Sequence, residues 1–190
     1  MDINDLVKGC LAGNQQHFDT LYDTYSKRLY HICMRYSGDE DEAKDILQDG
    51  FIKVFVQLKT FDMAKGTFDG WIKRIFVNTS IDYFRKKSHN INSVSLENVS
   101  DHLMHEDEND EPVYDLTTDQ IMDMVRELPT GYRLVFNLYV VEEMSHKQIA
   151  TMLGISENTS KTQLFKAKKA LQRKITEHMM DCQINSKRAI

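Results

Sequence analysis

Apolar residues in the first half of the chain recur every three or four positions, which is the period of a helix with one buried face. Three such patterns predict packed helices over residues 18–33, 43–58 and 68–83. Between the first two, Ser37, Gly38 and Asp39 supply a helix stop and a new N-cap. The pattern therefore predicts a helical bundle in this half.

The second predicted helix carries apolar residues on a face that its buried stripe does not need. At ~100° per residue, Ile52 and Val56 fall among polar and charged side chains instead of joining the stripe. Two interpretations are open: the pair packs against a neighbouring helix, or it forms the apolar centre of a protein-docking surface. The polar members of this face are Asp45, Gln48, Asp49 and Lys53.

The third predicted helix has a separate polar stripe made of Arg74, Asn78 and Arg85. An amide between two guanidinium groups can hydrogen-bond a base edge while the cations hold phosphates. The alternative is that the stripe is an ordinary polar edge of the helix, which would show the same spacing. The loop before this helix carries Lys65 and Gly66, and its apolar residues have the chemistry to admit an unstacked base. Those apolar residues are Phe61, Met63 and Phe68.

The second half of the chain predicts a helix-turn-helix. Pro129 fits the start of one helix, and Ser145 with Gln148 forms a capping-box pattern at the start of another. Gly154 can take the left-handed conformation of a tight turn, and Ser156 is placed to cap the helix that follows. An accidental helical hairpin is the alternative, but few hairpins combine this glycine and this cap with a basic second helix.

Charge supports a nucleic-acid role for that second helix. Residues 158–176 hold six Lys or Arg and no acidic residue, in a chain of formal net charge −5. Some of these cations would also offset the helix dipole, but Lys161 and Thr162 lie in the first turns, where a recognition helix reads bases. Neutralising ~4 phosphates would give a log–log salt dependence of about −3.6.

Composition extends the helical prediction to the whole chain. The 190 residues are 41% hydrophobic and 28% charged, with only 8 Gly and 2 Pro, which is typical of an all-α fold. Residues 101–115 contain seven acidic residues and no basic one, and they predict a flexible acidic linker or an acidic docking segment. We expect two small helical domains at 1–88 and 118–178, with the linker at 89–117 and a tail at 179–190.

Other classes of function lack their signatures. The chain has no Gly-rich phosphate loop, no nucleophile with an evident base and no HExxH motif, so we expect no catalysis and no cofactor. A single Glu143-x-x-His146 and the linker residues His102 and His105 do not make a metal site. The start of the chain lacks a signal peptide and no apolar run is long enough to span a bilayer, so a cytoplasmic protein is expected. The three cysteines, Cys10, Cys33 and Cys182, predict reduced thiols.

Three blocks in order resemble the group 4, or extracytoplasmic-function, sigma factors of bacterial RNA polymerase. DILQDGFIKVF (45–55) is similar to their polymerase-clamp segment, and FDGWIKRIFVNTSIDYFRKK (68–87) to their promoter −10 and melting segment. Residues 128–171, from LPTGYR to KAKKAL, are similar to their region 4, which reads the −35 element. The resemblance covers roughly residues 18–87 and 120–175.

The resemblance implies a function without catalysis: binding core RNA polymerase at its clamp helices and flap, reading double-stranded −35 DNA and melting the −10 strand. It implies that an anti-sigma factor is a further partner, and that the linker passes near the RNA exit path. The implied clamp-binding residues are Asp45, Gln48, Asp49, Ile52 and Lys53. The implied −10 residues are Lys65, Lys73, Arg74, Asn78 and Arg85. The implied −35 residues are Thr159, Lys161, Thr162, Gln163, Lys166 and Lys168.

The sequence departs from the family pattern at three positions. Phe55 stands where Trp is frequent, and Asn158 replaces a frequent Gly. Ser160 replaces a frequent Val at a position that faces the core, so its hydroxyl needs a partner if the helix is not to be loosened.

The rival interpretation is a helix-turn-helix regulator that binds operator DNA without polymerase. A sensing or dimerisation domain would need neither the Arg74–Asn78 stripe nor the mixed face around Asp49. A pure adaptor protein would leave the acid-free helix unexplained.

Overall fold

The computed structural model describes residues 2–90 and 116–188, with side chains described for 2–87 and 116–180. The described residues are helical and contain no strand, so the all-α prediction is confirmed. The predicted linker, including the acidic run at 101–115 with His102 and His105, lies largely outside the described residues, as does the side chain of Cys182.

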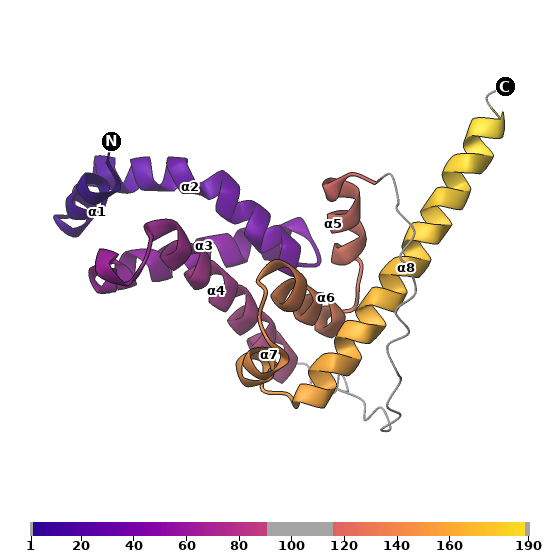
Figure 1. The fold of residues 1–190 in the computed structure, drawn as a ribbon. Coiled ribbons are helices and arrows are strands. Elements are labelled where there is room, and N and C mark those ends of the chain that lie inside the picture. The colour runs from indigo at the N-terminus through magenta and orange to yellow at the C-terminus, as the bar shows by residue number, and fades with distance from the viewer. Residues whose placement is uncertain (1, 91–115, 189–190) are drawn as a thin grey trace.

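The first half is a bundle of four α-helices (Figure 1). α1 (Ile3–Leu11), which the apolar pattern did not predict, packs on α2 (Gln15–Tyr36), and α3 (Glu40–Gln57) follows. Two single turns, η1 (Leu58–Thr60) and η2 (Met63–Lys65), then lead to α4 (Phe68–Asn90). The predicted cap between α2 and α3 is present: the Asp39 side chain accepts a 2.8 Å hydrogen bond from the Glu42 backbone N–H.

The predicted helical stripes form the core of this bundle. Tyr36, Phe76, Leu21 and Leu29 are among its largest fully buried side chains. Helices α3 and α4 approach closely at Gly50, because a Cβ there would lie 2.4 Å from the Phe76 ring. This contact fixes the side of α3 that faces away from the core.

The second half contains α5 (Thr118–Arg126), α6 (Thr130–Phe136), a π-helical turn η3 (Asn137–Val141), α7 (His146–Leu153) and the long α8 (Glu157–Arg188). Pro129 caps α6 and does not occupy its first helical position. Val125 and Leu128 pack with Ala167 and Leu171 of α8 in a small core of their own.

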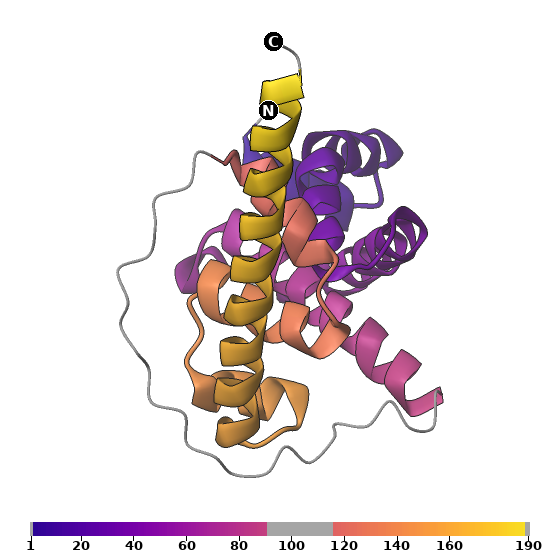
Figure 2. The ribbon, with the colours of Figure 1, turned by 90° about the vertical axis from the view of Figure 1, so that its right-hand side faces the viewer.

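The two halves lie against each other. Leu134, Val135, Leu138 and Ile149 of the second half belong to one continuous buried cluster with the core of the first half. Helix α5 contacts α2, and α7 contacts α4, while α8 runs along the outer side of α6 (Figures 1 and 2). The packing places the π turn beside the C-terminal end of α2, and Glu142, which follows the turn, beside Lys73 in the N-terminal part of α4.

Candidate nucleic-acid and protein interfaces

The α3 face that carries Ile52 and Val56 is open to solvent. Ile52 is 54% exposed and Val56 is 67% exposed. The interpretation that a neighbouring helix buries this pair is therefore wrong. Asp45, Gln48 and Asp49 are exposed beside it, and we call these five residues the α3 surface. It combines an apolar centre with an acidic and polar rim, the composition of a protein-docking site.

Lys53 lies at the edge of the α3 surface and is held by α4. Its Nζ lies 3.0 Å from Oδ2 of Asp82, and its side chain is 33% exposed. Of the five residues that the resemblance assigns to clamp binding, Lys53 is the one that forms an ion pair with a neighbouring helix.

The polar stripe of α4 is exposed as its spacing predicted. Arg74 and Asn78 are open to solvent, and Arg85 has only a 4.0 Å contact with Asp82. Lys65 precedes the helix, is 83% exposed at its side chain, and lies 3.4 Å from Asp62. These four residues are available to an anionic ligand because no strong ion pair holds them.

Lys73 differs from the other residues implied for −10 DNA. Its Nζ lies 2.7 Å from Oε2 of Glu142, which follows the π turn in the second half of the chain. Lys73 therefore flanks the exposed stripe and faces the contact between the halves.

The aromatic residues of the loop before α4 are largely used in packing. Phe68 is 3% exposed, and its ring packs against the rings of Phe61 and Trp71. The expectation that Phe68 helps to admit an unstacked base is wrong, because its faces are covered. Met63 is 54% exposed and is the apolar residue of the loop that remains open.

The helix-turn-helix has the predicted local geometry. The Ser145 side chain accepts from the Gln148 backbone N–H while the Gln148 side chain accepts from the Ser145 backbone, which completes the capping box. Gly154 has φ of +69°, in the left-handed region, and ends α7. Ser156 Oγ then accepts from the Thr159 backbone N–H at 3.0 Å and begins α8.

Ser160 has the partner that its buried position requires. It is fully buried, and its Oγ lies 2.9 Å from Nδ1 of His146 at the start of α7. The His146 ring stacks on Tyr139 of the π turn, with ring centroids 4.6 Å apart. A polar contact thus joins the two helices of the motif at a position where the resemblance implies an apolar one.

Half of the six residues implied for −35 DNA are exposed on α8. Lys161, Thr162 and Lys168 are exposed, whereas Thr159, Gln163 and Lys166 are partly covered. Gln163 lies over the start of α6, since a Cβ at Gly131 would be 3.3 Å from its amide nitrogen.

A polar contact between the halves was not predicted from the sequence. Arg133 of α6 is 4% exposed, and its Nε donates to the Tyr36 carbonyl at 2.8 Å. Asn137 Nδ2 donates to the Arg35 carbonyl at 2.8 Å. These two donors satisfy carbonyls at the end of α2, which have no partner within their own helix.

The electrostatics of this contact follow from its burial. Burial lowers the pKa of Arg133, and Glu42 and Asp39 oppose that shift. Burial also raises the pKa of the Tyr36 phenol, with Glu142 adding to the effect. Arg133 stays charged at neutral pH because its ordinary pKa lies far above 7.

The sequence did contain a signal for this contact. Arg133 and Asn137 interrupt an apolar run at a spacing of four, which places two polar residues on one face of a helix that is otherwise core. Burying such residues costs free energy unless their donors find acceptors. The acceptors on the other half are backbone carbonyls of α2. A pattern of side chains in the sequence cannot indicate which backbone carbonyls will be available.

The described residues contain neither a candidate membrane span nor a cluster of metal-binding side chains. Within residues 2–90 and 116–188, no helix combines the length and the low polarity needed to cross a membrane. No group of three or more His, Cys, Asp or Glu side chains in the same part of the chain is arranged to hold a metal ion.

Comparison with known proteins places both halves in one family. The family model for Sigma-70 region 2 matches residues 21–90, and that for Sigma-70, region 4 matches residues 118–171. Together they cover about two thirds of the chain, in the order in which the α3–α4 surfaces and the helix-turn-helix occur.

Curated relatives agree over nearly the whole length. The ECF RNA polymerase sigma factor SigW of Bacillus subtilis is 29% identical, over 93% of this chain and 98% of its own. SigM of the same organism, also an ECF sigma factor, is 25% identical over 81% and 92%. A solved structure, the sigma factor RpoE with the anti-sigma factor NepR from Bartonella quintana, matches with 20% identity and a TM-score of 0.48, covering 84% and 96%. The chain belongs to the sigma-70 family of RNA polymerase sigma factors and is of the extracytoplasmic-function type.

Proposed function

We propose that this sigma factor binds core RNA polymerase through the α3 surface and brings two DNA-binding elements to a promoter. The observation that carries the proposal is the exposed pair Ile52 and Val56, rimmed by Asp45, Gln48 and Asp49. An operator-binding regulator has no use for such a surface beside a helix-turn-helix. The exposed apolar pair would provide buried area on docking, and the carboxylates would select a basic partner such as the polymerase clamp.

The −10 role falls to α4 and the loop before it. Arg74, Asn78 and Arg85 are exposed along one stripe, with Lys65 at the start. The guanidinium groups would hold backbone phosphates while the Asn78 amide bonds an exposed base edge. Met63, the exposed apolar residue of that loop, would contact an unstacked base.

The −35 role falls to the first turns of α8. Lys161, Thr162 and Lys168 are exposed there, and Thr159, Gln163 and Lys166 flank them. An N-terminal helix end carrying cations suits the major groove, because the base-reading side chains and the helix dipole both face the DNA. The same domain would contact the polymerase flap.

Further parts of the proposal follow from the family. The protein would act in the cytoplasm, without catalysing a reaction, and an anti-sigma factor would control its access to polymerase. The domains would be 1–88 and 118–178, with 89–117 as the linker and 179–190 as a tail.

The test is transcription in vitro with purified core polymerase on a library of randomised promoters. We expect a defined subset of promoters to fire only when the protein is added. If none fires, and the protein alone shifts a palindromic site at low concentration, the regulator interpretation is correct instead.

Asp49→Arg tests the α3 surface within the same assay. A charge reversal at the rim should weaken core binding by about tenfold or more, because like charges would meet at a desolvated interface. The thermal midpoint should not change, since Asp49 is exposed and surface substitutions rarely exceed about 0.5 kcal/mol.

Asp23→Arg is the matched control for this variant. It makes the same charge change at an exposed position of α2, which is not one of the five residues of the α3 surface. Equal losses of core binding in the two variants would argue against a specific surface, and a lowered midpoint in Asp49→Arg would assign the face a structural role.

A further inference from the structure

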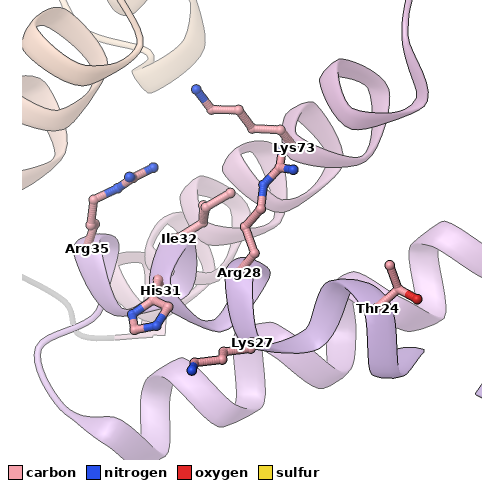
Figure 3. Close-up of a pocket in the computed structure, with 7 residues that line it drawn as sticks. All are labelled: Thr24, Lys27, Arg28, His31, Ile32, Arg35 and Lys73. Atoms are coloured by element: carbon pink, nitrogen blue, oxygen red, sulfur yellow. The ribbon is translucent and has the colours of Figure 1, made fainter. Parts of the chain in front are cut away.

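A basic pocket lies on the side of α2 that faces α4. Its volume is about 590 Å³. Six of its lining residues come from α2, and Lys73 comes from α4 (Figure 3). The lining residues are Thr24, Lys27, Arg28, His31, Ile32, Arg35 and Lys73. The polymerase-binding and DNA-binding surfaces described above do not include the α2 residues of this pocket.

The pocket has more positive charge than its neighbours neutralise. Four lining residues are Lys or Arg, and two carboxylates pair with them: Asp69 with Arg28, and Glu142 with both Arg35 and Lys73. Lys27 is exposed and has no ion pair among the described residues. In a chain of net charge −5, this local excess favours an anionic ligand.

The donors in the pocket are only partly used. The Arg35 guanidinium reaches Glu142 with one nitrogen at 3.3 Å, and its buried Nε has no acceptor among the described residues. Thr24 already donates its hydroxyl to the Thr20 carbonyl, so binding of an anion there would rest on the cations. A phosphate has more acceptor oxygens than one carboxylate and could use the donors that Glu142 leaves free.

Glu142 comes from the other half of the chain. It follows the π turn, its side chain is 11% exposed, and its two oxygens pair with Arg35 and Lys73 at 3.3 Å and 2.7 Å. A carboxylate with two cationic partners occupies the place that a phosphate oxygen pair would take. Because Glu142 reaches these cations only when the halves are packed together, its contact and anion binding compete for the same groups.

The position of Lys73 indicates which kind of anion the pocket would bind. It flanks the exposed Arg74–Asn78 stripe on α4, which is the proposed path of the melted strand. We propose that this pocket binds a backbone phosphate of single-stranded DNA next to the −10 strand, and that Glu142 occupies the pocket until the halves separate. The assignment of the ligand rests on the proposed function, because it takes promoter DNA as the strand that crosses α4.

The test uses the full chain and a fluorescein-labelled oligo(dT) in fluorescence anisotropy, across a series of NaCl concentrations. The double variant Lys27→Gln, Arg28→Gln removes two cations. If it loses one phosphate contact, the log–log salt slope should become shallower by about 0.7. Lys8→Gln, Lys59→Gln is the matched control, since both lysines are exposed and lie outside the pocket lining.

Glu142→Gln tests the competition. Removing the carboxylate charge frees Arg35 and Lys73, so the affinity for oligo(dT) should rise by about threefold to tenfold and the slope should steepen by about 0.7. Glu143→Gln, an exposed neighbour, should leave both unchanged. Circular dichroism checks that each variant keeps its helices.

Three results would overturn the proposal. One is a pocket variant whose slope equals that of its lysine control. A second is Glu142→Gln binding no tighter than Glu143→Gln. The third is inorganic pyrophosphate displacing the oligonucleotide at equal phosphate concentration, which would make the pocket a site for small phosphates. If any of these occurs while promoters still fire with core polymerase, the pocket assignment fails and the sigma-factor function stands.

Discussion

Ser160 shows how one residue can depart from a family pattern without loosening the fold. A buried hydroxyl costs free energy when it has no partner, and Ser160 is fully buried. His146 supplies that partner at 2.9 Å, and Tyr139 holds the imidazole ring by stacking on it. The three residues come from three different elements of the second half, so one polar contact ties the start of α7 to the start of α8.

Ser160→Ala should therefore destabilise the protein by about 1 kcal/mol, because His146 loses a buried hydrogen-bond partner and a small void appears. Urea unfolding measures this as a lower midpoint. Thr162→Ala is the control, since Thr162 is exposed two residues away and should change stability by less than about 0.5 kcal/mol. Identical midpoints for the two variants would mean that the His146 contact contributes no stability.

At the scale of elements, the helix-turn-helix depends on the backbone at Gly154. Its φ of +69° allows the chain to leave α7 and enter α8 with three residues between the helices. No atom lies within 4 Å of the place where a Cβ would be, so only the conformation requires glycine here. The angle between α7 and α8 thus depends on one torsion, and the exposure of Lys161 and Thr162 depends on that angle.

Gly154→Ala should destabilise the chain by about 1–2 kcal/mol, because the left-handed backbone conformation is strained for alanine but not for glycine. Gly154→Asn should lose less, since asparagine tolerates this region better. Thermal unfolding ranks the variants, and anisotropy with duplex −35 DNA reports on the recognition helix. A result in which alanine and asparagine behave alike would show that the turn relaxes to another conformation.

The whole molecule is held in one piece by contacts that join its halves. Arg133 and Asn137 donate to the last carbonyls of α2, and Glu142 pairs with Arg35 and Lys73. Buried apolar residues of α6 and α7 complete the contact. A sigma factor whose two DNA-binding elements must reach separate promoter elements would have to open this arrangement. Glu142 is placed to influence that opening, because its loss would remove two ion pairs between the halves at once.

Glu142→Arg should separate the halves, because it places a third cation between Arg35 and Lys73 and turns attraction into repulsion. Small-angle X-ray scattering of the full chain should then give a larger radius of gyration than the wild type. Glu143→Arg makes the same charge change on an exposed neighbour and should remain compact. Equal radii for the two variants would show that the apolar contact alone keeps the halves together.

The sequence by itself determined most of the local structure. Helical periods, the caps at Asp39 and Ser145, and the turn at Gly154 depend on neighbours within a few residues, and the structure contains all of them. The acid-free stretch at 158–176 was equally readable from the sequence, because the charge along a helix can be recognised without knowing its partners. The short helix α1 and the π turn were not predicted. Both depend on contacts outside their own residues: α1 packs on α2, and Asn137 of the π turn donates to the Arg35 carbonyl.

Only the tertiary structure decided which side chains remained free. It left Ile52 and Val56 in solvent and covered Phe68, although both sets have apolar patterns that allow either outcome. It gave Ser160 its partner and brought Glu142 to Arg35 and Lys73 from more than 60 residues away. The physical reason is that burial and pairing depend on distances between elements, whereas periodicity and capping depend on distances along the chain.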